Sequence, residues 1–335
     1  MSVLVTGGCG YIGSHIALHL IEKNINVIII DNLSNSYRHI LNRISSITGK
    51  NIKFYEVDLR NKTALESIFK SNNIESVMHL AASKSVPEST KFPEFYYSNN
   101  ISSTLNLLEV MNKIGCHKLI FSSSCTVYGS GNGNPCSEND PLSYENPYGH
   151  SKLICEDILS QLVKSSSNWK IGVLRYFNPA GSHHSGLLGE EQIGAPGNLV
   201  PIIANVLLND NLFLNIYGTD YQTKDGTGIR DYLHVEDVAD AHLHSMEALK
   251  NIGSHTLNIG TGKGYSVLDV VKSFEKISGK SIPLRYMPRR PGDIAVAYAN
   301  PDKSYELLGW RSKKNLDEIC LSSLLWAKYL KIQKF

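Results

Sequence analysis

The segment "NPYGHSKL", residues 146–153, places a tyrosine and a lysine where they could act on one proton together. Tyr148 and Lys152 are four residues apart, which is about one helical turn, so they would share a helix face. A phenol with its ordinary pKa of about 10 is a poor base at neutral pH unless a nearby cation stabilises the phenolate. The Lys152 ammonium could supply that charge. Tyrosine and lysine are also common on helix surfaces, so the pair alone leaves both interpretations open.

The helix that would carry this pair begins near Pro147. Proline suits the first turn of a helix, and the following segment "YGHSKLICEDILSQLVK" keeps apolar residues at helical spacing. The other elements of the chain decide whether a ligand can reach the start of this helix.

Three glycines separate the first predicted strand from the first predicted helix. The segment "VLVTGGCGYIGSHIA" holds Gly7, Gly10 and Gly13 in a G-x-x-G-x-x-G spacing, one residue longer than the dinucleotide fingerprint G-x-G-x-x-G. Glycines there let the backbone approach a pyrophosphate, which would bind the N–H groups at the positive end of a helix. Asp31 ends the second predicted strand, where a carboxylate would bind a ribose and repel a 2′-phosphate. These features predict NAD rather than NADP.

Asp58 follows the third predicted strand in "YEVDLRN". Its carboxylate could accept a hydrogen bond from an adenine amino group, or it could cap the helix that begins near Asn61. The sequence favours the two roles about equally.

The first half of the chain alternates β-branched apolar runs with helical patterns, which predicts a mostly parallel sheet covered by helices on both faces. We therefore predict an α/β, Rossmann-type doubly wound domain over residues 1–177, and a smaller C-terminal α/β substrate-binding lobe over 178–335 that is interleaved with it. The predicted strands are "VLVT", "NVIIID", "IKFYEV", "SVMHLA", "KLIFSSS" and "WKIGVLRYF".

Composition excludes several classes of function. The chain has 335 residues, of which 42% are hydrophobic, and a formal net charge of +2, so we expect no binding to nucleic acid or to an anionic membrane. Nor does it contain an apolar run long enough to span a bilayer.

Its six cysteines are scattered without a C-x-x-C pair, and the start of the chain lacks the pattern of a secretory signal. We therefore expect reduced thiols and a cytoplasmic protein. His183 and His184 come without a third ligand at metal-binding spacing, so no metal site is predicted.

Three elements together, the glycine loop, the Ser-rich strand end "FSSSCTVYG" (121–129) and the Y-x-x-x-K of 148–152, resemble the extended short-chain dehydrogenase/reductase family. Within it, "DGTGIRDYLHVEDVAD" (225–240), "LRYFNPAG" (174–181) and "MPRRPGD" (287–293) are similar to the UDP-glucose 4-epimerases over almost the whole chain. The resemblance implies a catalytic group of Tyr148, Lys152 and Ser124.

The implied reaction is the reversible 4-epimerisation of UDP-hexoses with tightly bound NAD. Tyr148 takes the proton of the sugar 4-OH while hydride passes from C4 to NAD, the 4-keto sugar turns over, and hydride returns to its opposite face. The positions that match NAD-binding residues of the family are Gly7, Gly10, Tyr11, Ile12, Gly13, Asp31, Asn32, Asp58, Leu59, Leu80, Lys84, Asn99, Ser124, Tyr148, Lys152 and Phe177.

The same resemblance implies a UDP-sugar site. Arg230 and Arg290 suit it, since a planar guanidinium can bind a diphosphate through paired hydrogen bonds. A small residue at Ala297 implies space for an N-acetyl group, and hence UDP-GlcNAc and UDP-GalNAc as further substrates. The matching positions are Lys84, Ser124, Tyr148, Asn178, Asn198, Leu199, Tyr217, Arg230, Tyr232, Arg290, Asp293 and Ala297.

Three alternatives remain. A sugar-nucleotide 4,6-dehydratase would need Asp-Glu after the strand serine, where this chain has Cys125 and Thr126. A dehydrogenase that releases its reduced cofactor and a non-enzymatic NAD-binding sensor are the other two. The resemblance also implies a homodimer formed by helices near 92–113 and 148–165.

Overall fold

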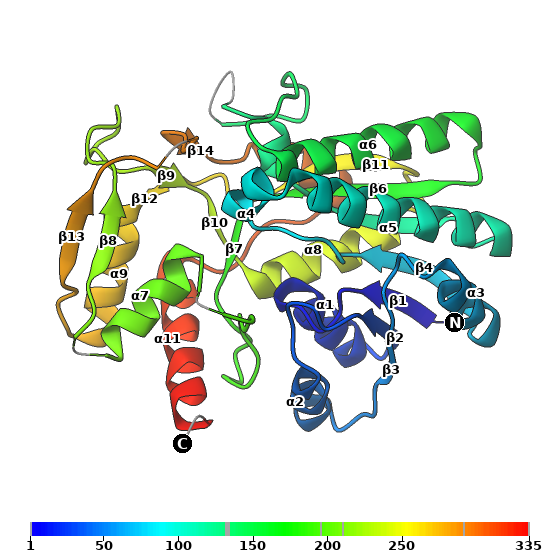
Figure 1. The fold of residues 1–335 in the computed structure, drawn as a ribbon, viewed down its shortest axis with the longest axis horizontal. Helices are drawn as coiled ribbons and strands as arrows, with labels where there is room; N and C mark the ends of the chain where they lie inside the picture. The colour runs from blue at the N-terminus through cyan, green and yellow to red at the C-terminus, as the bar shows by residue number, and fades with distance from the viewer. Residues whose placement is uncertain (1, 131–134, 195, 210, 291, 334–335) are drawn as a thin grey trace.

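The central sheet of the computed structural model, which describes residues 2–130, 135–194, 196–209, 211–290 and 292–333, has seven parallel strands in the order β11-β6-β5-β4-β1-β2-β3 (Figure 1). The predicted strands of the first half are all present. The strands are β1 (Ser2–Thr6), β2 (Asn26–Asp31), β3 (Lys53–Glu56), β4 (Ile74–His79), β5 (Lys118–Ser124), β6 (Lys170–Tyr176) and β11 (His255–Ile259).

Helices cover both faces of this sheet, which confirms the doubly wound fold. Strands such as β1 are buried along their whole length, and this explains their nearly continuous apolar sequence. One core lies under α1 (Tyr11–Glu22), α2 (His39–Thr48) and α8 (Val235–Ala248). The other lies under α3 (Lys62–Ser71), α5 (Pro93–Ile114) and α6 (Pro147–Ser165). Short helices α4 (Val86–Lys91), η1 (Cys125–Val127) and α10 (Asp302–Leu308) complete this part.

The strand order reverses direction at β1, because β2 lies on one side of it and β4 on the other. In open parallel sheets, ligands bind outside the carboxyl ends of the strands at such a point. The glycine loop follows β1 there, and Ser124 ends β5 at the same edge.

The smaller lobe lies on the left of Figure 1, and its core is formed by α7 (Leu199–Leu207), α9 (Val267–Ser278) and α11 (Leu316–Gln333). Two parallel strands, β8 (Leu214–Tyr217) and β13 (Leu284–Met287), cover one side. The connecting strands are β7 (Asn178–Ala180) with β10 (Tyr232–His234), and β9 (Ile229–Arg230) with β12 (Tyr265–Ser266) and β14 (Val296–Ala297).

The chain beyond residue 177 contributes to both lobes. Strand β11 pairs with β6, and α8 packs against α1, so residues 235–259 return to the sheet. The division into 1–177 and 178–335 stays a prediction. Among the described helices, none combines the length and apolar character that crossing a membrane requires.

A buried ion pair fixes α6 to the sheet. Glu156 on α6 accepts hydrogen bonds from Arg175 on β6, at 3.0 Å from Nε and 2.6 Å from Nη2. Arg175 also donates to the Tyr128 hydroxyl at 2.9 Å, and Ser123 on β5 donates to Glu156. The helix that carries Tyr148 is thus joined to both strands beneath it.

Replacing Glu156 by glutamine should strongly destabilise the fold. The Glu156→Gln change leaves the Arg175 guanidinium buried without its counter-charge, and breaking a buried pair in this way costs about 3–5 kcal/mol. Urea unfolding of the purified variant measures the loss. The control is Glu109→Gln, which removes one partner of the exposed Lys62–Glu109 pair and should change stability little. Equal effects of the two changes would contradict the role given to Arg175 and Glu156.

Candidate active site

The start of α6 brings Tyr148 close to the end of β5. The Asn146 side chain caps the helix by accepting a hydrogen bond from the Gly149 N–H at 2.9 Å. A Cβ at Gly149 would lie 2.9 Å from the Thr126 carbonyl oxygen, so the glycine allows the helix to pack closely on the segment after β5. Across this contact the Ser124 hydroxyl is near enough to the Tyr148 hydroxyl to lower the pKa of the tyrosine. The structure thus joins two of the three predicted catalytic side chains.

Lys152, one turn further along α6, is almost completely buried. Its ammonium donates to the Ser122 carbonyl oxygen at 2.7 Å and lies 4.9 Å from the centre of the Phe121 ring. Burial lowers the pKa of Lys152 to about 8, because a low-dielectric surrounding disfavours the charged form. At neutral pH the side chain still carries its positive charge beneath Tyr148.

Burial also dominates the titration of the tyrosine. It raises the pKa of Tyr148 to about 12, while the nearby Ser124 hydroxyl acts in the opposite direction. The Lys152 ammonium therefore does not by itself bring the pKa of Tyr148 below its ordinary value. A positive charge on a ligand beside the hydroxyl would favour the phenolate further.

The glycine loop forms a cradle in which a side chain would not fit. Gly7 has φ +68°, and a Cβ there would lie 2.8 Å from the Ala81 nitrogen. A Cβ at Gly13 would lie 2.2 Å from the Gly7 carbonyl oxygen. Helix α1 begins after Gly10 without a side-chain cap, so its first N–H groups are open to an anion. This geometry fits the pyrophosphate of a dinucleotide.

Asp31 lies beside this cradle at the end of β2. Its carboxylate accepts hydrogen bonds from the Cys9 and Leu33 N–H groups, each at 2.9 Å, and from the Ser36 hydroxyl. These bonds fix its position next to the loop, as a ribose-binding carboxylate requires. Burial and the Asp31 charge both raise the pKa of the Cys9 thiol, which makes this cysteine a poor nucleophile.

The structure distinguishes the two roles considered for Asp58. Asn61, not Asp58, caps α3 by accepting from the Ala64 N–H at 3.1 Å. Asp58 instead accepts hydrogen bonds from Arg60, which hold the pKa of its carboxyl well below the usual range, and from the Asn32 amide at 3.0 Å. Two predicted NAD-binding residues, Asn32 and Asp58, are therefore in contact.

Glu190 is a site residue that the sequence reasoning missed. Its carboxylate lies 3.3 Å from the Lys84 ammonium and accepts from the Asn198 amide at 2.7 Å. Glu190 thereby joins Lys84, which is predicted to contact both NAD and the sugar, to Asn198, which is predicted to contact the sugar nucleotide. Because Glu190 is far from Lys84 in the sequence, no spacing pattern could have revealed this contact.

The predicted diphosphate residues gather on the smaller lobe. Asp293 pairs with Arg230 at 2.5 Å and with Arg290 at 2.9 Å. The Arg290 guanidinium lies 5.3 Å from the centre of the Tyr217 ring. A carboxylate between two arginines orients both guanidinium groups in one place.

The other predicted residues take these positions. Tyr11 donates its hydroxyl proton to the Gly181 carbonyl at 2.7 Å, and Asn99 donates to the Ser83 hydroxyl at 3.0 Å. Ala297 on β14 is buried and is in register with Arg230. Leu59, Phe177 and Tyr232 are buried, and Ile12, Leu80, Asn178 and Leu199 are half-buried.

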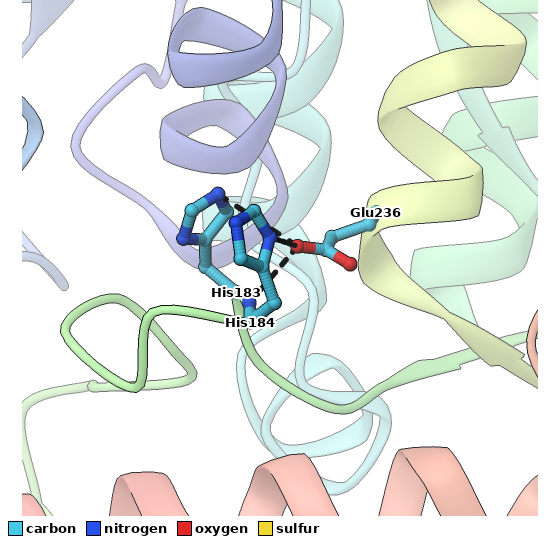
Figure 2. Close-up of side chains that lie close together, drawn as sticks. All are labelled: His183, His184 and Glu236. Atoms are coloured by element: carbon cyan, nitrogen blue, oxygen red, sulfur yellow. Dashed lines mark hydrogen bonds and ion pairs between the residues drawn. The ribbon is translucent and has the colours of Figure 1, made fainter. Parts of the chain in front are cut away.

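His183 and His184 do acquire a third potential ligand in the folded chain. Glu236, at the start of α8, reaches toward both imidazoles (Figure 2), and its Oε1 lies 2.8 Å from His184 Nδ1. The ligand atoms of the three residues all lie within 4.8 Å of one another. The absence of a third ligand, on which the expectation of no metal rested, therefore does not hold in three dimensions.

Comparison with known proteins agrees with this geometry. The sequence profile of the NAD dependent epimerase/dehydratase family matches residues 3–260. The UDP-glucose 4-epimerase of Bacillus subtilis is 48% identical over 327 residues, which cover 97% of this chain and 96% of that protein. The crystal structure of UDP-glucose 4-epimerase from Bifidobacterium longum, in complex with NAD+ and UDP, has a TM-score of 0.95 and 46% identity, and the match covers 98% of both chains. The UDP-Glc/GlcNAc 4-epimerase of Campylobacter jejuni has a TM-score of 0.85 and 35% identity, over 98% of this chain and 99% of that one.

Stability should depend on pH through Lys152. An unfolded lysine has a pKa of about 10.5, above the folded value, so the unfolded state binds more protons at this residue and the contribution of Lys152 to stability rises between pH 8 and 10.5. Lys152→Met lacks this dependence. Its unfolding free energy relative to wild type should therefore fall by about 2 kcal/mol between pH 7.5 and 10.

Urea unfolding at the two pH values, with matched NAD content, measures the difference. Lys164→Met, at an exposed position on the same helix, is the control. If the difference in unfolding free energy between Lys152→Met and wild type stayed constant with pH, burial would not lower the pKa of Lys152.

Proposed function

We propose that this chain, which belongs to the NAD dependent epimerase/dehydratase family and groups there with the UDP-glucose 4-epimerases, interconverts UDP-glucose and UDP-galactose. The observation that carries the proposal is the contact of Tyr148 with Ser124 above the buried Lys152. These side chains lie at the sheet edge where the glycine cradle opens.

Each catalytic residue has a distinct task. Tyr148 takes the proton from the sugar 4-OH and returns it after the 4-keto sugar has turned over. Ser124, whose hydroxyl is near that of Tyr148, can orient the tyrosine hydroxyl and relay the proton. Lys152 contributes a fixed positive charge below the tyrosine. NAD, when bound, supplies the hydride acceptor for C4 and then the hydride donor for its opposite face.

The cofactor would be held mainly by backbone. Gly7 and Gly13 leave room for the pyrophosphate at the start of α1, and Asp31 is positioned to accept from the ribose. The paired Asn32 and Asp58 suit the adenosine end. This distribution agrees with a cofactor that stays bound through a cycle without net redox change.

The UDP-sugar would bind between the two lobes and contact the residues of each lobe that are described above. Arg230 and Arg290, oriented by Asp293, match a diphosphate in charge and geometry. Lys84 and Asn198, joined by Glu190, lie on the segments that would border the sugar and the nucleotide. Tyr217, below Arg290, offers a flat face to the nucleotide.

The alternative reactions fit less well. A 4,6-dehydratase needs an additional acid and base to eliminate water, whereas Cys125 and Thr126 form η1 directly after Ser124. Burial raises the pKa of Cys125 to about 12, so its thiol cannot serve as the base. A non-catalytic NAD sensor would have no use for the joined Tyr148 and Ser124.

The exposed surface and the cysteines bear on two further proposals, a homodimer and a cytoplasmic location. Phe92, Phe95 and Leu105 expose apolar area along α5, which supports a homodimer formed by α5 and α6. The six cysteines, all of which lie in the described part of the chain, form no disulfide with one another, which supports a reducing compartment such as the cytoplasm.

Removing the phenol of Tyr148 should abolish most of the turnover. Purified protein incubated with UDP-galactose and no added NAD should form UDP-glucose, and Tyr148→Phe should lower kcat by about 10²–10⁴, the usual effect of losing a general base. Product analysis measures the rate, and denaturation followed by dinucleotide assay measures bound NAD. The variant should keep its NAD, because its fold and glycine cradle are unchanged.

Near-normal turnover by Tyr148→Phe would refute the assigned base. A wild-type protein that retains NAD yet never converts UDP-galactose would instead support the sensor. A wild-type protein that purifies without NAD and needs it added would support a dehydrogenase.

The same site should also accept N-acetylated sugars. The small side chain of Ala297 lies on β14 in register with Arg230, so it borders the arginine cluster of the sugar nucleotide site. An acetamido group is several atoms larger than a hydroxyl, and a small residue in the pocket wall leaves space for it. We therefore propose that UDP-GlcNAc and UDP-GalNAc are interconverted as well.

Ala297→Tyr should separate the two pairs of sugars. Overpacking a close-fitting site costs about 1–3 kcal/mol, so kcat/KM for UDP-GalNAc should fall by at least roughly tenfold. Activity on UDP-galactose should largely persist, which makes this substrate the internal control. Ala297→Ser, with nearly the original volume, should keep both activities. If wild type does not act on UDP-GalNAc, or the tyrosine variant treats both pairs alike, Ala297 does not set this specificity.

A further inference from the structure

A histidine-lined cavity lies apart from the residues assigned to NAD and sugar. It has a volume of about 220 Å³ and is formed where the loop after β7 meets α1 and the start of α8. Its lining includes His15, His19, Glu22, His183, His184 and Glu236. Such a density of imidazole and carboxylate groups is not needed for the epimerase reaction.

Two imidazoles of this cavity, His15 and His183, are buried with an unused nitrogen. His183 is 4% exposed, and its Nε2 makes no hydrogen bond within the described part of the chain. A buried polar atom without a partner is costly, and it calls for a ligand or an ion. Nε2 lies 3.7 Å from Glu236 Oε1 and 3.5 Å from Glu22 Oε1. The unused nitrogen thus faces two carboxylates.

The spacing of the ligand atoms suits a tetrahedral ion. Bonds of about 2.0–2.1 Å to a tetrahedral Zn²⁺ separate neighbouring ligand atoms by about 3.3 Å. The distances from Glu236 Oε1 are 2.8 Å to His184 Nδ1 and 3.7 Å to His183 Nε2, which bracket that value. The three ligand atoms lie within 4.8 Å of one another, so side-chain shifts would bring them around one ion.

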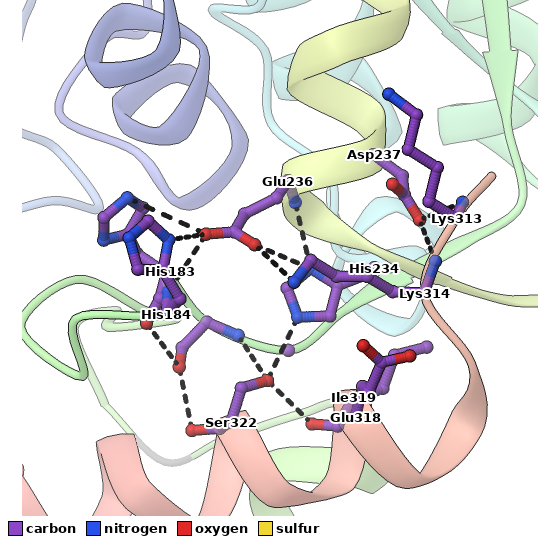
Figure 3. A network of polar contacts seen from close by, with 12 residues as sticks. His183, His184, His234, Glu236, Asp237, Lys313, Lys314, Glu318, Ile319 and Ser322 are labelled. Atoms are coloured by element: carbon purple, nitrogen blue, oxygen red, sulfur yellow. Dashed lines mark hydrogen bonds and ion pairs between the residues drawn. The ribbon is translucent and has the colours of Figure 1, made fainter. Parts of the chain in front are cut away.

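The surrounding contacts orient these ligands. His183 Nδ1 accepts a hydrogen bond from the Ser185 N–H at 3.3 Å and lies 2.8 Å from the Ser185 hydroxyl. An ion at Nε2 would require the other tautomer, in which Nδ1 carries the proton and donates to that hydroxyl oxygen. Lys314 binds Glu236 through Oε2, at 3.0 Å (Figure 3), while Oε1 accepts from the His184 N–H at 3.0 Å and keeps a second lone pair for the ion. Glu22 is close enough to fill a fourth position, which a water molecule could also occupy.

We propose that His183, His184 and Glu236 form a Zn²⁺ site. Two imidazoles and one carboxylate with an open position are a ligand set that proteins use for zinc, whereas Mg²⁺ and Ca²⁺ prefer oxygen ligands alone. The ion would join the loop after β7 to α8. This loop also receives the Tyr11 hydroxyl at Gly181 and leads to Glu190, so the ion would stiffen a segment that both lobes contact.

Metal binding itself provides the test. Wild-type protein is first treated with EDTA and then titrated with Zn²⁺ in competition with a chromophoric chelator. It should bind one ion per chain, and Co²⁺ in place of Zn²⁺ should give the visible absorption of a four-coordinate site. Added Zn²⁺ should also raise Tm, because an ion that binds only the folded state stabilises it.

His184→Ala is the informative variant, since this side chain is 71% exposed and its removal should leave the fold intact. The His184→Ala change should weaken Zn²⁺ binding by about tenfold to hundredfold. It should also abolish both the Co²⁺ absorption and the Tm rise. His39→Ala, which removes a partly exposed histidine on α2, is the matched control and should bind like wild type. Glu236→Gln should also lose the site.

Absence of stoichiometric Zn²⁺ binding to wild type would overturn the proposal. So would equal binding by wild type and His184→Ala, because the ion would then occupy thiols or other groups. Neither result bears on the epimerase assignment, which the UDP-galactose assay tests separately.

Discussion

The buried ammonium of Lys152 is the constraint around which the active site is built. A charge in so low a dielectric must be compensated, and the fold supplies the Ser122 carbonyl, the face of Phe121 and, one turn along α6, the carboxylate of Glu156. Glu156 in turn needs Arg175, which anchors the helix to β6. The same contacts that make the charge tolerable therefore fix the rotation and depth of α6. The position of Tyr148 against Ser124 follows from that placement.

A second level of organisation links the two lobes through the loop between β7 and α7. Its beginning accepts the Tyr11 hydroxyl at Gly181, and Ser182 donates two hydrogen bonds to Ser322 on α11. Further on, Trp326 on α11 donates to the Glu190 carbonyl at 3.0 Å, while the Glu190 carboxylate holds Lys84. One loop thus contacts the helix of the glycine cradle, the smaller lobe and the predicted sugar site. Movement of the smaller lobe would therefore displace Glu190 and, through it, Lys84.

The features that sequence alone predicted correctly are local in the chain. The strands of the first half, the start of α6 at Pro147 and the glycine turn before α1 each depend on neighbouring residues, so periodicity and turn chemistry suffice to find them. Strand β11 was not predicted, because its pairing with β6 joins segments about 80 residues apart. The contacts of Glu190 and the Glu156–Arg175 pair were not predicted for the same reason. The effect of burial on Tyr148 also could not be predicted, since it depends on how much water the folded site excludes.

The two predicted ligand sites would hold their ligands by different means, and this difference fits the reaction. The glycine loop would present close backbone and the open N–H groups at the start of α1, where binding orders no side chains and so costs little conformational entropy. The arginine cluster is made of long side chains, and Asp293 already neutralises part of the charge of Arg230 and Arg290. A diphosphate must compete with that carboxylate, which weakens binding and eases release. An epimerase needs this asymmetry, because its cofactor is restored within each cycle while its sugar nucleotide must leave.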